Sequence, residues 1–311
     1  YFSREQQRYE KNIDAHNAIK SESWFAGGLW TWAGFAPHNA FAIATMREAM
    51  RACRAKGVEN VVMTMWGDNG AECSKFAVLP ALFMVAQMAR GIDDEETIHA
   101  NFEKEFVIPF EDFRALDLAG TQNDSAEAIY NPEKYLLYCD PFMGQFDNRV
   151  KPADAAGYAN CAARLAVYAD HAEYGYLFRS LRALCAFLSV KADLGIRTRA
   201  AYLSGDKKAA KALCTDYDAA LERLDAFYAA YEQQWMHENK PQGFDVVDLR
   251  IGGQRQRLLH CRDRLLAYAE GRLDRIEELE EPVLDCCCEE KADGQATRAI
   301  FWHEIASANV I

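Results

Sequence analysis

The chain has 311 residues, 50% of them hydrophobic and 26% charged, and this length accommodates two domains that each bury a core. Its 47 Asp and Glu residues outnumber its 35 Lys and Arg residues, which gives a formal net charge of −12 at pH 7. This acidic balance argues against nucleic acid and against an anionic membrane surface as partners. No apolar run approaches the length of a membrane span.

The first strand-like run is Trp24–Trp32, whose glycines and paired tryptophans lie at the start of a loop. The next segment, Asn39–Lys56, predicts an amphipathic helix with Gly57 as its C-cap. Its apolar positions recur at helical spacing, at Phe41, Ile43, Met46, Met50 and Cys53. Strand followed by helix is the pattern of one βα unit.

The second strand-like run, Val58–Asp68, is rich in Val and Met, is apolar on both faces, and ends in a Trp, a Gly and a carboxylate. This pattern predicts a buried strand of a parallel α/β barrel, in which active sites lie at the C-terminal strand ends. Lys75–Arg90 predicts another apolar helix, with Pro80 in its first turns and Gly91 at its end. Connections of this length allow the two strands to pair in parallel.

The tip of the second strand predicts a sugar-binding pair. Trp66 offers an aromatic face for stacking on a pyranose, and Asp68 offers a carboxylate that accepts hydrogen bonds from sugar hydroxyls. The simpler alternative is a buried Trp and a loop-capping Asp. At the tip of the first strand, Trp30 and Trp32 fit core packing as well as they fit a ligand site.

Other polar residues near these runs are weaker candidates. Glu72 is a loop carboxylate, a type that is usually solvated or caps a turn, and His38 follows Pro37 at a helix start. The acidic cluster Asp93–Glu96 comes after Gly91, where a new helix is expected to begin. Negative charge suits a helix N-terminus, so this cluster is interpreted as structural.

From about Gly91 onward the composition shifts to Ala, Leu, Tyr and charged residues, which predicts a second, helical domain. Ala153–Leu194 predicts one or two helices and Lys207–Glu238 another. The latter carries an apolar stripe at Leu213, Tyr217, Ala220, Leu224, Phe227 and Tyr231. A similar stripe is expected through Leu259, Leu266, Ala269, Leu273 and Ile276. The two stripes predict helices that pack antiparallel along their length.

The ten cysteines are scattered, and most lie in helical patterns where a free Cys behaves as a small hydrophobe. This usage predicts a reducing, cytoplasmic compartment. Three adjacent cysteines occur at Cys286–Cys288, but adjacent side chains do not all converge on one ion. We therefore expect no metal site and no cofactor.

Several longer motifs resemble those of family-20 glycoside hydrolases, which are exo-acting β-N-acetylhexosaminidases. Trp24–Trp32, Phe35–Asn39 and Met63–Cys73 resemble the end of the catalytic barrel of that family. The resemblance continues through Arg90–Glu96, Tyr138–Phe142 and Trp235–Phe244, and is closest to a bacterial branch with an added C-terminal helical domain.

The resemblance implies a mainly α fold with a small α/β part. Residues 1–90 would be the C-terminal part of a catalytic TIM (β/α)8 barrel, from the end of strand 6 to helix 8, and contain its last two βα units. Residues 91–311 would form the C-terminal helical domain.

The implied activity is hydrolysis of terminal N-acetylglucosamine or N-acetylgalactosamine from glycans. The family uses a substrate-assisted, retaining mechanism, in which the substrate's acetamido oxygen is the nucleophile and the Glu of an Asp-Glu pair is the general acid. No position of this chain matches that pair. We therefore expect a C-terminal fragment that carries no catalytic residue and is inactive when isolated.

The resemblance also carries over a sugar-recognition set. Trp66 matches the family tryptophan that stacks on the sugar, and Asp68 stands where many members have a Glu, one methylene longer. Many relatives end the preceding strand in Tyr-x-Asp, whereas this chain has Trp30-Thr31-Trp32. The candidate substrate-binding residues are thus Trp66, Asp68, Trp30 and Trp32.

A competing hypothesis is a non-catalytic helical module with a structural or carbohydrate-binding role. The presence of Trp66 and Asp68 at a strand end favours the enzyme. In either case, two parallel strands taken from a barrel leave exposed edges, which favours pairing with another copy. We therefore expect a homo-oligomer.

Overall fold

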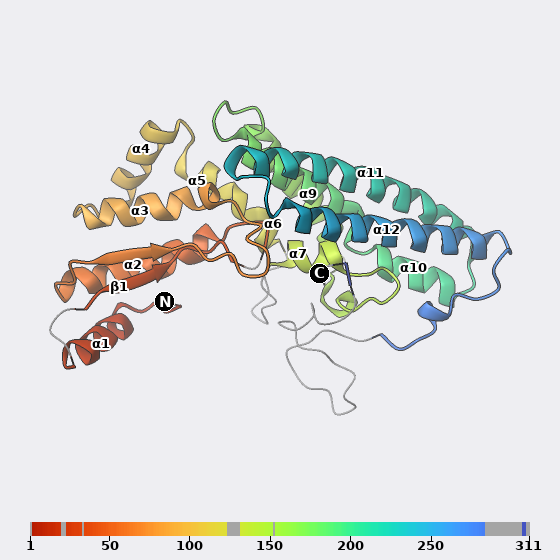
Figure 1. Ribbon diagram of the computed structural model, residues 1–311, viewed down its shortest axis with the longest axis horizontal. Helices are drawn as coiled ribbons and strands as arrows, with labels where there is room; N and C mark the ends of the chain where they lie inside the picture. Colours follow the sequence, from red (N-terminus) through yellow and green to blue (C-terminus); the bar gives the residue numbers. More distant parts are fainter. Residues whose placement is uncertain are drawn as a thin grey trace. The chain divides into compact units, whose positions relative to one another are not determined.

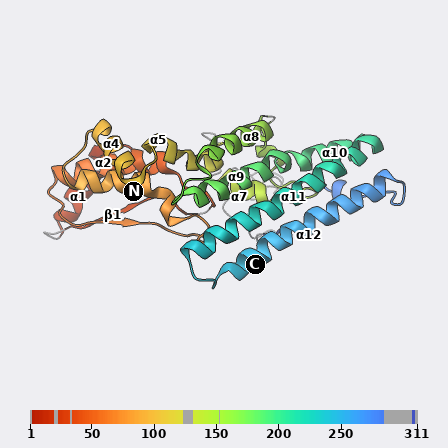
Figure 2. The same cartoon turned by 90° about the horizontal axis from the view of Figure 1, so that it is seen from above.

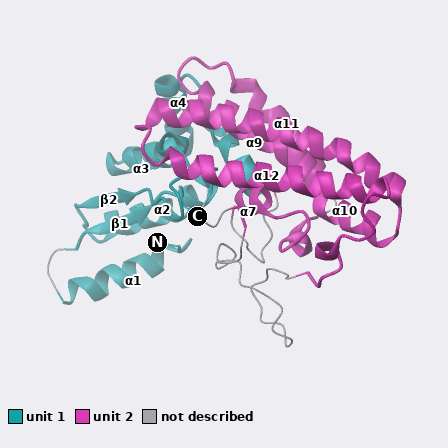
Figure 3. Cartoon of the chain, turned by 45° about the vertical axis from the view of Figure 1, so that its right-hand side comes forward, with its two compact units in different colours: residues 1–121 teal, residues 122–311 magenta. Residues whose placement is uncertain are grey.

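The computed structural model describes residues 2–19, 23–32, 34–122, 131–151, 153–283 and 307–308. These residues are mostly helical and include a two-stranded sheet, which confirms the predicted class of a mainly α protein with a small α/β part. The chain divides into two compact units, Tyr1–Thr121 and Gln122–Ile311 (Figure 3). Within the described ranges, no helix combines the length and apolarity needed to cross a membrane.

The sheet of the first unit consists of strand β1 (Phe25–Gly28) and strand β2 (Val61–Thr64), joined through helix α2 (Asn39–Ala55). The strands are parallel, with Phe25 opposite Val61 and Gly28 opposite Thr64. The ladder extends to Leu29, whose N–H donates to the Thr64 carbonyl at 2.9 Å. The predicted βα order and parallel pairing are therefore confirmed.

Strand β2 is more exposed than its apolar sequence predicts. Met63 faces α2, because a side chain at Gly27 would meet the ends of both Met46 and Met63. Val62 points to the opposite face and is 44% exposed. A parallel strand is fully buried only when both faces of its sheet are covered. The expectation of a buried strand is thus wrong for this face.

Helices α1 and α3 pack on α2; α1 precedes β1 in the chain, whereas α3 and the helices after it in this unit follow β2 (Figure 1). The carboxylate of Asp94 caps helix α4 by accepting from the Thr97 N–H at 2.9 Å, which confirms the structural interpretation of the acidic cluster. The elements are α1 (Gln6–Asn17), η1 (Lys75–Val78), α3 (Leu79–Ala89), α4 (Glu95–Phe106), α5 (Phe110–Phe113), η2 (Arg114–Asp117) and α6 (Leu118–Thr121).

The second unit is helical in its described residues, and its two longest helices, α11 and α12, lie side by side (Figure 2). Helix α9 packs against both α8 and α11. The elements are α7 (Pro132–Tyr138), η3 (Asp147–Arg149), α8 (Asp154–Leu165), η4 (Ala166–Tyr168), α9 (Gly175–Lys191), α10 (Leu194–Leu203), α11 (Lys207–Glu238), α12 (Phe244–Ala269) and η5 (Glu277–Leu279).

The two predicted stripes have different outcomes. All six predicted positions of the α11 stripe are buried, and the helix has the expected bounds. In α12 the buried residues are one position earlier than predicted, with Leu258 and Leu265 in place of Leu259 and Leu266. Helix α12 ends at Ala269, so Leu273 and Ile276 do not belong to it. Its buried face also includes Arg250 and Gln254, which an apolar pattern does not reveal.

The loop between α11 and α12 packs against Trp235, which lies near the end of α11. Trp235 Nε1 donates to the Lys240 carbonyl at 2.9 Å, and the Trp235 ring lies 5.8 Å from the Phe244 ring. Gly243 has φ 96°, and a Cβ there would lie 3.3 Å from the same indole. These contacts favour a helix stop and restart over a binding role for this loop.

The segment that follows α7 is held by a buried ion pair. Asp140 accepts from Arg257 Nε of α12 at 2.5 Å, and its Oδ1 also accepts from the N–H groups of Phe142 and Met143. Burial acts to raise the pKa of Asp140, but the Arg257 and backbone hydrogen bonds outweigh it and hold that pKa below its usual value. Lys191, also buried, donates to the Cys139 carbonyl at 2.7 Å. The Tyr138–Phe142 motif therefore has a structural role.

Asp140→Asn is expected to lower the free energy of unfolding by about 2 kcal/mol, because it removes the buried charge that accepts from Arg257 and leaves this guanidinium with the partly exposed Glu278 carboxylate as its ion-pair partner. Its matched control is Asp225→Asn, which breaks the exposed pair with Arg255 and should cost less than about 1 kcal/mol. Because the pKa of Asp140 is lowered on folding, the wild-type advantage should shrink as the pH falls below the carboxyl's ordinary pKa. Urea unfolding followed by circular dichroism measures both; equal costs for the two variants would contradict the assignment.

Candidate functional site

Two groups of aromatic residues follow the C-terminal ends of β1 and β2, which lie at the same end of the parallel sheet. The two groups differ in their exposure to solvent. Trp66 follows β2 and is 50% exposed, and Asp68, two residues later, is also exposed. An indole face and a carboxylate on the same exposed turn can stack on an apolar ring face and accept hydrogen bonds from hydroxyls. This arrangement agrees with the sequence-based choice of Trp66 and Asp68, whose binding role stays a prediction.

The main chain of Trp66 is held by polar groups from two neighbouring segments. Its carbonyl oxygen accepts from Thr31 Oγ1 at 2.7 Å and from Lys75 Nζ at 3.0 Å. Lys75 Nζ also donates to Thr31 Oγ1 at 3.1 Å, so the three polar atoms form a closed triangle. Thr31 is fully buried and lies in the loop after β1, behind Leu29 and Trp30 in the chain, whereas Lys75 begins η1.

The turn after Trp66 adopts an uncommon backbone conformation. Asn69 and Ala71 have φ values of 55° and 52°, a region that residues with a Cβ seldom occupy. The Ala71 N–H donates to the Gly67 carbonyl at 3.1 Å and closes the turn. A Cβ at Gly67 would lie 2.6 Å from the Ala71 Cβ, so this position requires glycine. The turn thus presents Asp68 from a tightly closed loop.

Trp30 and Trp32 lie in the core, at 3% and 8% exposure. Their rings are 4.5 Å apart at 31°, and the Trp30 ring makes an edge contact with Phe41 of α2 at 5.1 Å. This burial agrees with the core-packing alternative, which the sequence left open. In the described conformation they form a wall beneath the surface, and their assignment as substrate-binding residues stays a prediction.

The two weaker candidates, His38 and Glu72, both lie in structured parts of the first unit. His38 is the N-cap of α2, and its Nδ1 accepts from the Phe41 N–H at 3.3 Å. Glu72 is 3% exposed, so it is not the solvated residue that the sequence allowed, and its role as a turn cap stays a prediction. It is buried because the tight turn after Trp66 directs the chain back into the unit.

A buried carboxylate that sequence reasoning missed holds the amino end of α2. Asp117 of η2 accepts from the backbone N–H groups of Asn39 and Ala40, each at 2.8 Å, and from Asn39 Nδ2 at 2.9 Å. Asn39 Nδ2 also donates to the Ala77 carbonyl of η1, at 2.9 Å. Negative charge at a helix N-terminus is favourable, and this one ties α2 to the segment that follows Trp66.

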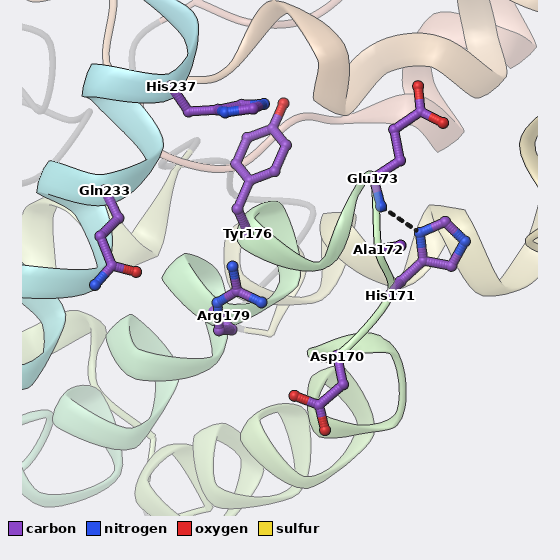
Figure 4. A pocket seen from close by; sticks show the side chains of 8 residues that line it. All are labelled: Asp170, His171, Ala172, Glu173, Tyr176, Arg179, Gln233 and His237. Atoms are coloured by element: carbon purple, nitrogen blue, oxygen red, sulfur yellow. Dashed lines mark hydrogen bonds between the residues drawn. The ribbon is translucent and has the colours of Figure 1, made fainter.

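The second unit has a separate open hollow between the start of α9 and the end of α11 (Figure 4). The Tyr176 ring lies 4.5 Å from the His237 ring, and burial together with the nearby Glu238 carboxylate raises the pKa of Tyr176. His171 Nδ1 accepts from the N–H groups of Glu173 and Tyr174 and thereby caps the turn before α9. The lining residues are Asp170, His171, Ala172, Glu173, Tyr176, Arg179, Gln233 and His237.

This hollow was not predicted from the sequence, because its residues come from segments about 60 positions apart and carry no motif. Opposite charges line it, from Asp170 and Glu173 on one side and Arg179 on the other. Arg179 Nη1 donates to the Ala169 carbonyl at 2.6 Å, so this guanidinium supports the local backbone. The arrangement favours a surface depression with structural polar contacts.

The model of the Glycoside Hydrolase 20C C-terminal domain matches residues 109–298 of the chain. The match covers more than half of the sequence; it begins in the first unit, before Asp117, and continues through α7 to α12. No curated protein matches the chain significantly.

Asp117→Asn is expected to lower the free energy of unfolding by about 1–3 kcal/mol, because the amide places an NH2 group against backbone N–H donors. Asp14→Asn, at an exposed carboxylate paired with Lys56, is the control and should change it by less than about 1 kcal/mol. Urea titrations followed by tryptophan fluorescence measure both variants.

The same substitution has a defined pH dependence. Burial raises the pKa of Asp117 from 3.8 to about 6, against the hydrogen bonds from Ala40 and Asn39. Between these pH values the folded state holds a proton that the unfolded chain has released, so wild-type stability falls as the pH rises. The advantage of the wild type over Asp117→Asn should therefore narrow from about pH 4 to about pH 7. A gap that widens over this range would refute the expected titration.

Proposed function

Because this chain belongs to glycoside hydrolase family 20, through the C-terminal domain of its 20C branch, we propose that it is the C-terminal part of a β-N-acetylhexosaminidase. The family match over residues 109–298 is the observation that carries this proposal. The parent enzyme would remove terminal N-acetylglucosamine or N-acetylgalactosamine from glycans.

In this proposal, residues 1–90 are the last two βα units of a TIM (β/α)8 barrel, and residues 91–311 are the helical domain. The parallel pairing of β1 and β2 through α2 supports the barrel assignment, since barrel strands are joined in this way. The exposed face of β2 at Val62 supports it further, because a barrel strand needs neighbours that cover both faces. The compact first unit extends beyond Arg90 to Thr121, so helices α4 to α6 pack with the proposed barrel segment.

The proposed role of this chain is sugar recognition. Trp66 stacks on the sugar ring and Asp68 accepts hydrogen bonds from its hydroxyls, while Trp30 and Trp32 form the aromatic wall behind them. The Asp-Glu pair that serves substrate-assisted catalysis would come from other strands of the parent barrel. The half-exposed Trp66 ring at the C-terminal end of a parallel strand supports this division of labour.

The second candidate is a non-catalytic helical module with a structural or carbohydrate-binding role. It is favoured by the extent of the family match, which describes a C-terminal domain and begins at residue 109, after both strands. An activity assay of the full parent protein distinguishes the two candidate functions. Changing Trp66 lowers turnover if this chain is part of the enzyme's sugar site, and leaves turnover unchanged if it is a non-catalytic module.

Two further properties complete the proposal. The exposed edges and apolar face of the strand pair favour a homo-oligomer. The seven cysteines that the structure describes are all buried, as expected of small hydrophobic side chains, which supports a reducing, cytoplasmic compartment. The Cys286–Cys288 run lies outside the described residues.

Trp66→Ala is expected to weaken binding of N-acetylglucosamine about tenfold, because the stacking surface is lost. The matched control is Trp24→Ala, which removes an indole of similar exposure from the opposite, N-terminal end of β1. Saturation-transfer NMR with the free sugar measures both affinities. Equal weakening by the two substitutions would argue against a site at the strand tips.

The isolated chain is expected to release no chromophore from a chromogenic N-acetylglucosaminide, because it contains no Asp-Glu pair that matches the family acid. The assay compares the purified wild type with Asp68→Asn. Turnover that disappears in the variant would overturn the proposal that the acid lies elsewhere in the parent.

A further inference from the structure

We propose that Lys75, acting together with Thr31, is a positioning residue that fixes the Trp66 indole at the strand tip. Lys75 lies nine residues after Trp66 and returns to its carbonyl oxygen across the intervening turn. Thr31 reaches the same oxygen from the loop that follows the neighbouring strand β1. The main chain of the exposed tryptophan is thus tied to both adjacent segments of the unit.

The hydrogen-bond directions in this triangle are fully determined. An ammonium group only donates and a carbonyl only accepts, so Lys75 donates to Trp66. Thr31 has one hydroxyl proton, which it donates to the same carbonyl at 2.7 Å, and its lone pairs accept from Lys75 at 3.1 Å. The Trp66 carbonyl therefore uses both of its lone pairs. Two bonds involve a charged donor, which makes them stronger than neutral ones.

The turn between Trp66 and Lys75 explains why such a tie matters. Asn69 and Ala71 both occupy the left-handed region, which is unfavourable for residues with a side chain. A turn of this kind relaxes if one of its ends is free to move. Lys75 joins the far end of the turn to the near end, so the turn keeps its conformation and the indole keeps its direction.

The burial of the three groups supports a positioning role. Thr31 is fully buried, so its hydroxyl holds a fixed place from which the triangle is built. Trp66 is half exposed, so protein atoms cover only part of its surface. A rigid aromatic platform binds a sugar with a smaller loss of conformational entropy than a mobile one. This last step rests on the proposed function of Trp66 in sugar stacking.

The test uses Lys75→Met in the full chain, with Lys75→Arg as the conservative variant. The Trp66 signal among the six tryptophans is isolated by subtracting the spectrum of the same variant with Trp66→Phe. Lys56→Met is the matched control, because Lys56 also makes a 2.7 Å bond, to Asp14, but at the C-terminal end of α2. Acrylamide quenching and fluorescence anisotropy report the mobility of the indole, and saturation-transfer NMR reports the affinity for N-acetylglucosamine.

We expect Lys75→Met to raise the quenching and lower the anisotropy of the Trp66 signal, and to weaken sugar binding about fivefold to tenfold. Lys75→Arg should restore part of both effects, and Lys56→Met should change neither. If Lys75→Met does not fold, Thr31→Val removes the other donor to the same carbonyl and should move both readouts in the same direction.

The readouts separate this inference from the proposed function. An unchanged Trp66 signal in Lys75→Met and Thr31→Val, or an equal change in Lys56→Met, overturns the positioning role. If Lys75→Met makes Trp66 more mobile but the wild type binds no sugar, the positioning role is supported and the proposed sugar site is refuted.

Discussion

The strand tips depend on one buried carboxylate at the amino end of α2. Asp117 accepts from the first backbone N–H groups of that helix, and the Asn39 side chain donates to the Ala77 carbonyl. The loop before α2 carries the aromatic wall of Trp30 and Trp32, and the segment before Ala77 carries Trp66. Asp117 thus acts together with the Thr31–Trp66 hydrogen bond to hold the two loops near each other, because a helix N-terminus offers donors in a fixed direction.

The second unit also uses buried charged groups to hold its backbone, here both a carboxylate and an ammonium group. Asp140 binds Arg257 and two backbone N–H groups, and Lys191 binds backbone carbonyls beside it. In both units a buried carboxylate accepts from backbone N–H groups as well as from side chains, and these bonds join segments that are distant in the chain. The Tyr138–Phe142 motif, which resembles family-20 hydrolases, is therefore explained by these structural contacts, whereas Trp66 at the tip of β2 is exposed.

Sequence reasoning succeeded where local periodicity decides the structure. The α11 helix and its stripe follow from spacing alone, and so do the two short strands and the cap at Asp94. It failed where burial depends on partners distant in the chain. The α12 stripe was one position late, since the face that α12 buries is set by its packing against α11 and also includes the polar Arg250 and Gln254. Asp117 carried no signal because its partners lie 77 and 78 residues away.

The sequence by itself determined the helical class, the two strands, the tryptophans and carboxylate at their ends, and the resemblance to a family that the comparison then showed. These features depend on residue type and spacing within a few turns of chain. Only the tertiary structure decided that Trp66 is exposed while Trp30 and Trp32 are buried, and that Thr31 and Lys75 meet at one carbonyl. Exposure and hydrogen bonding are set by which segments pack together, and that depends on contacts between residues far apart in sequence.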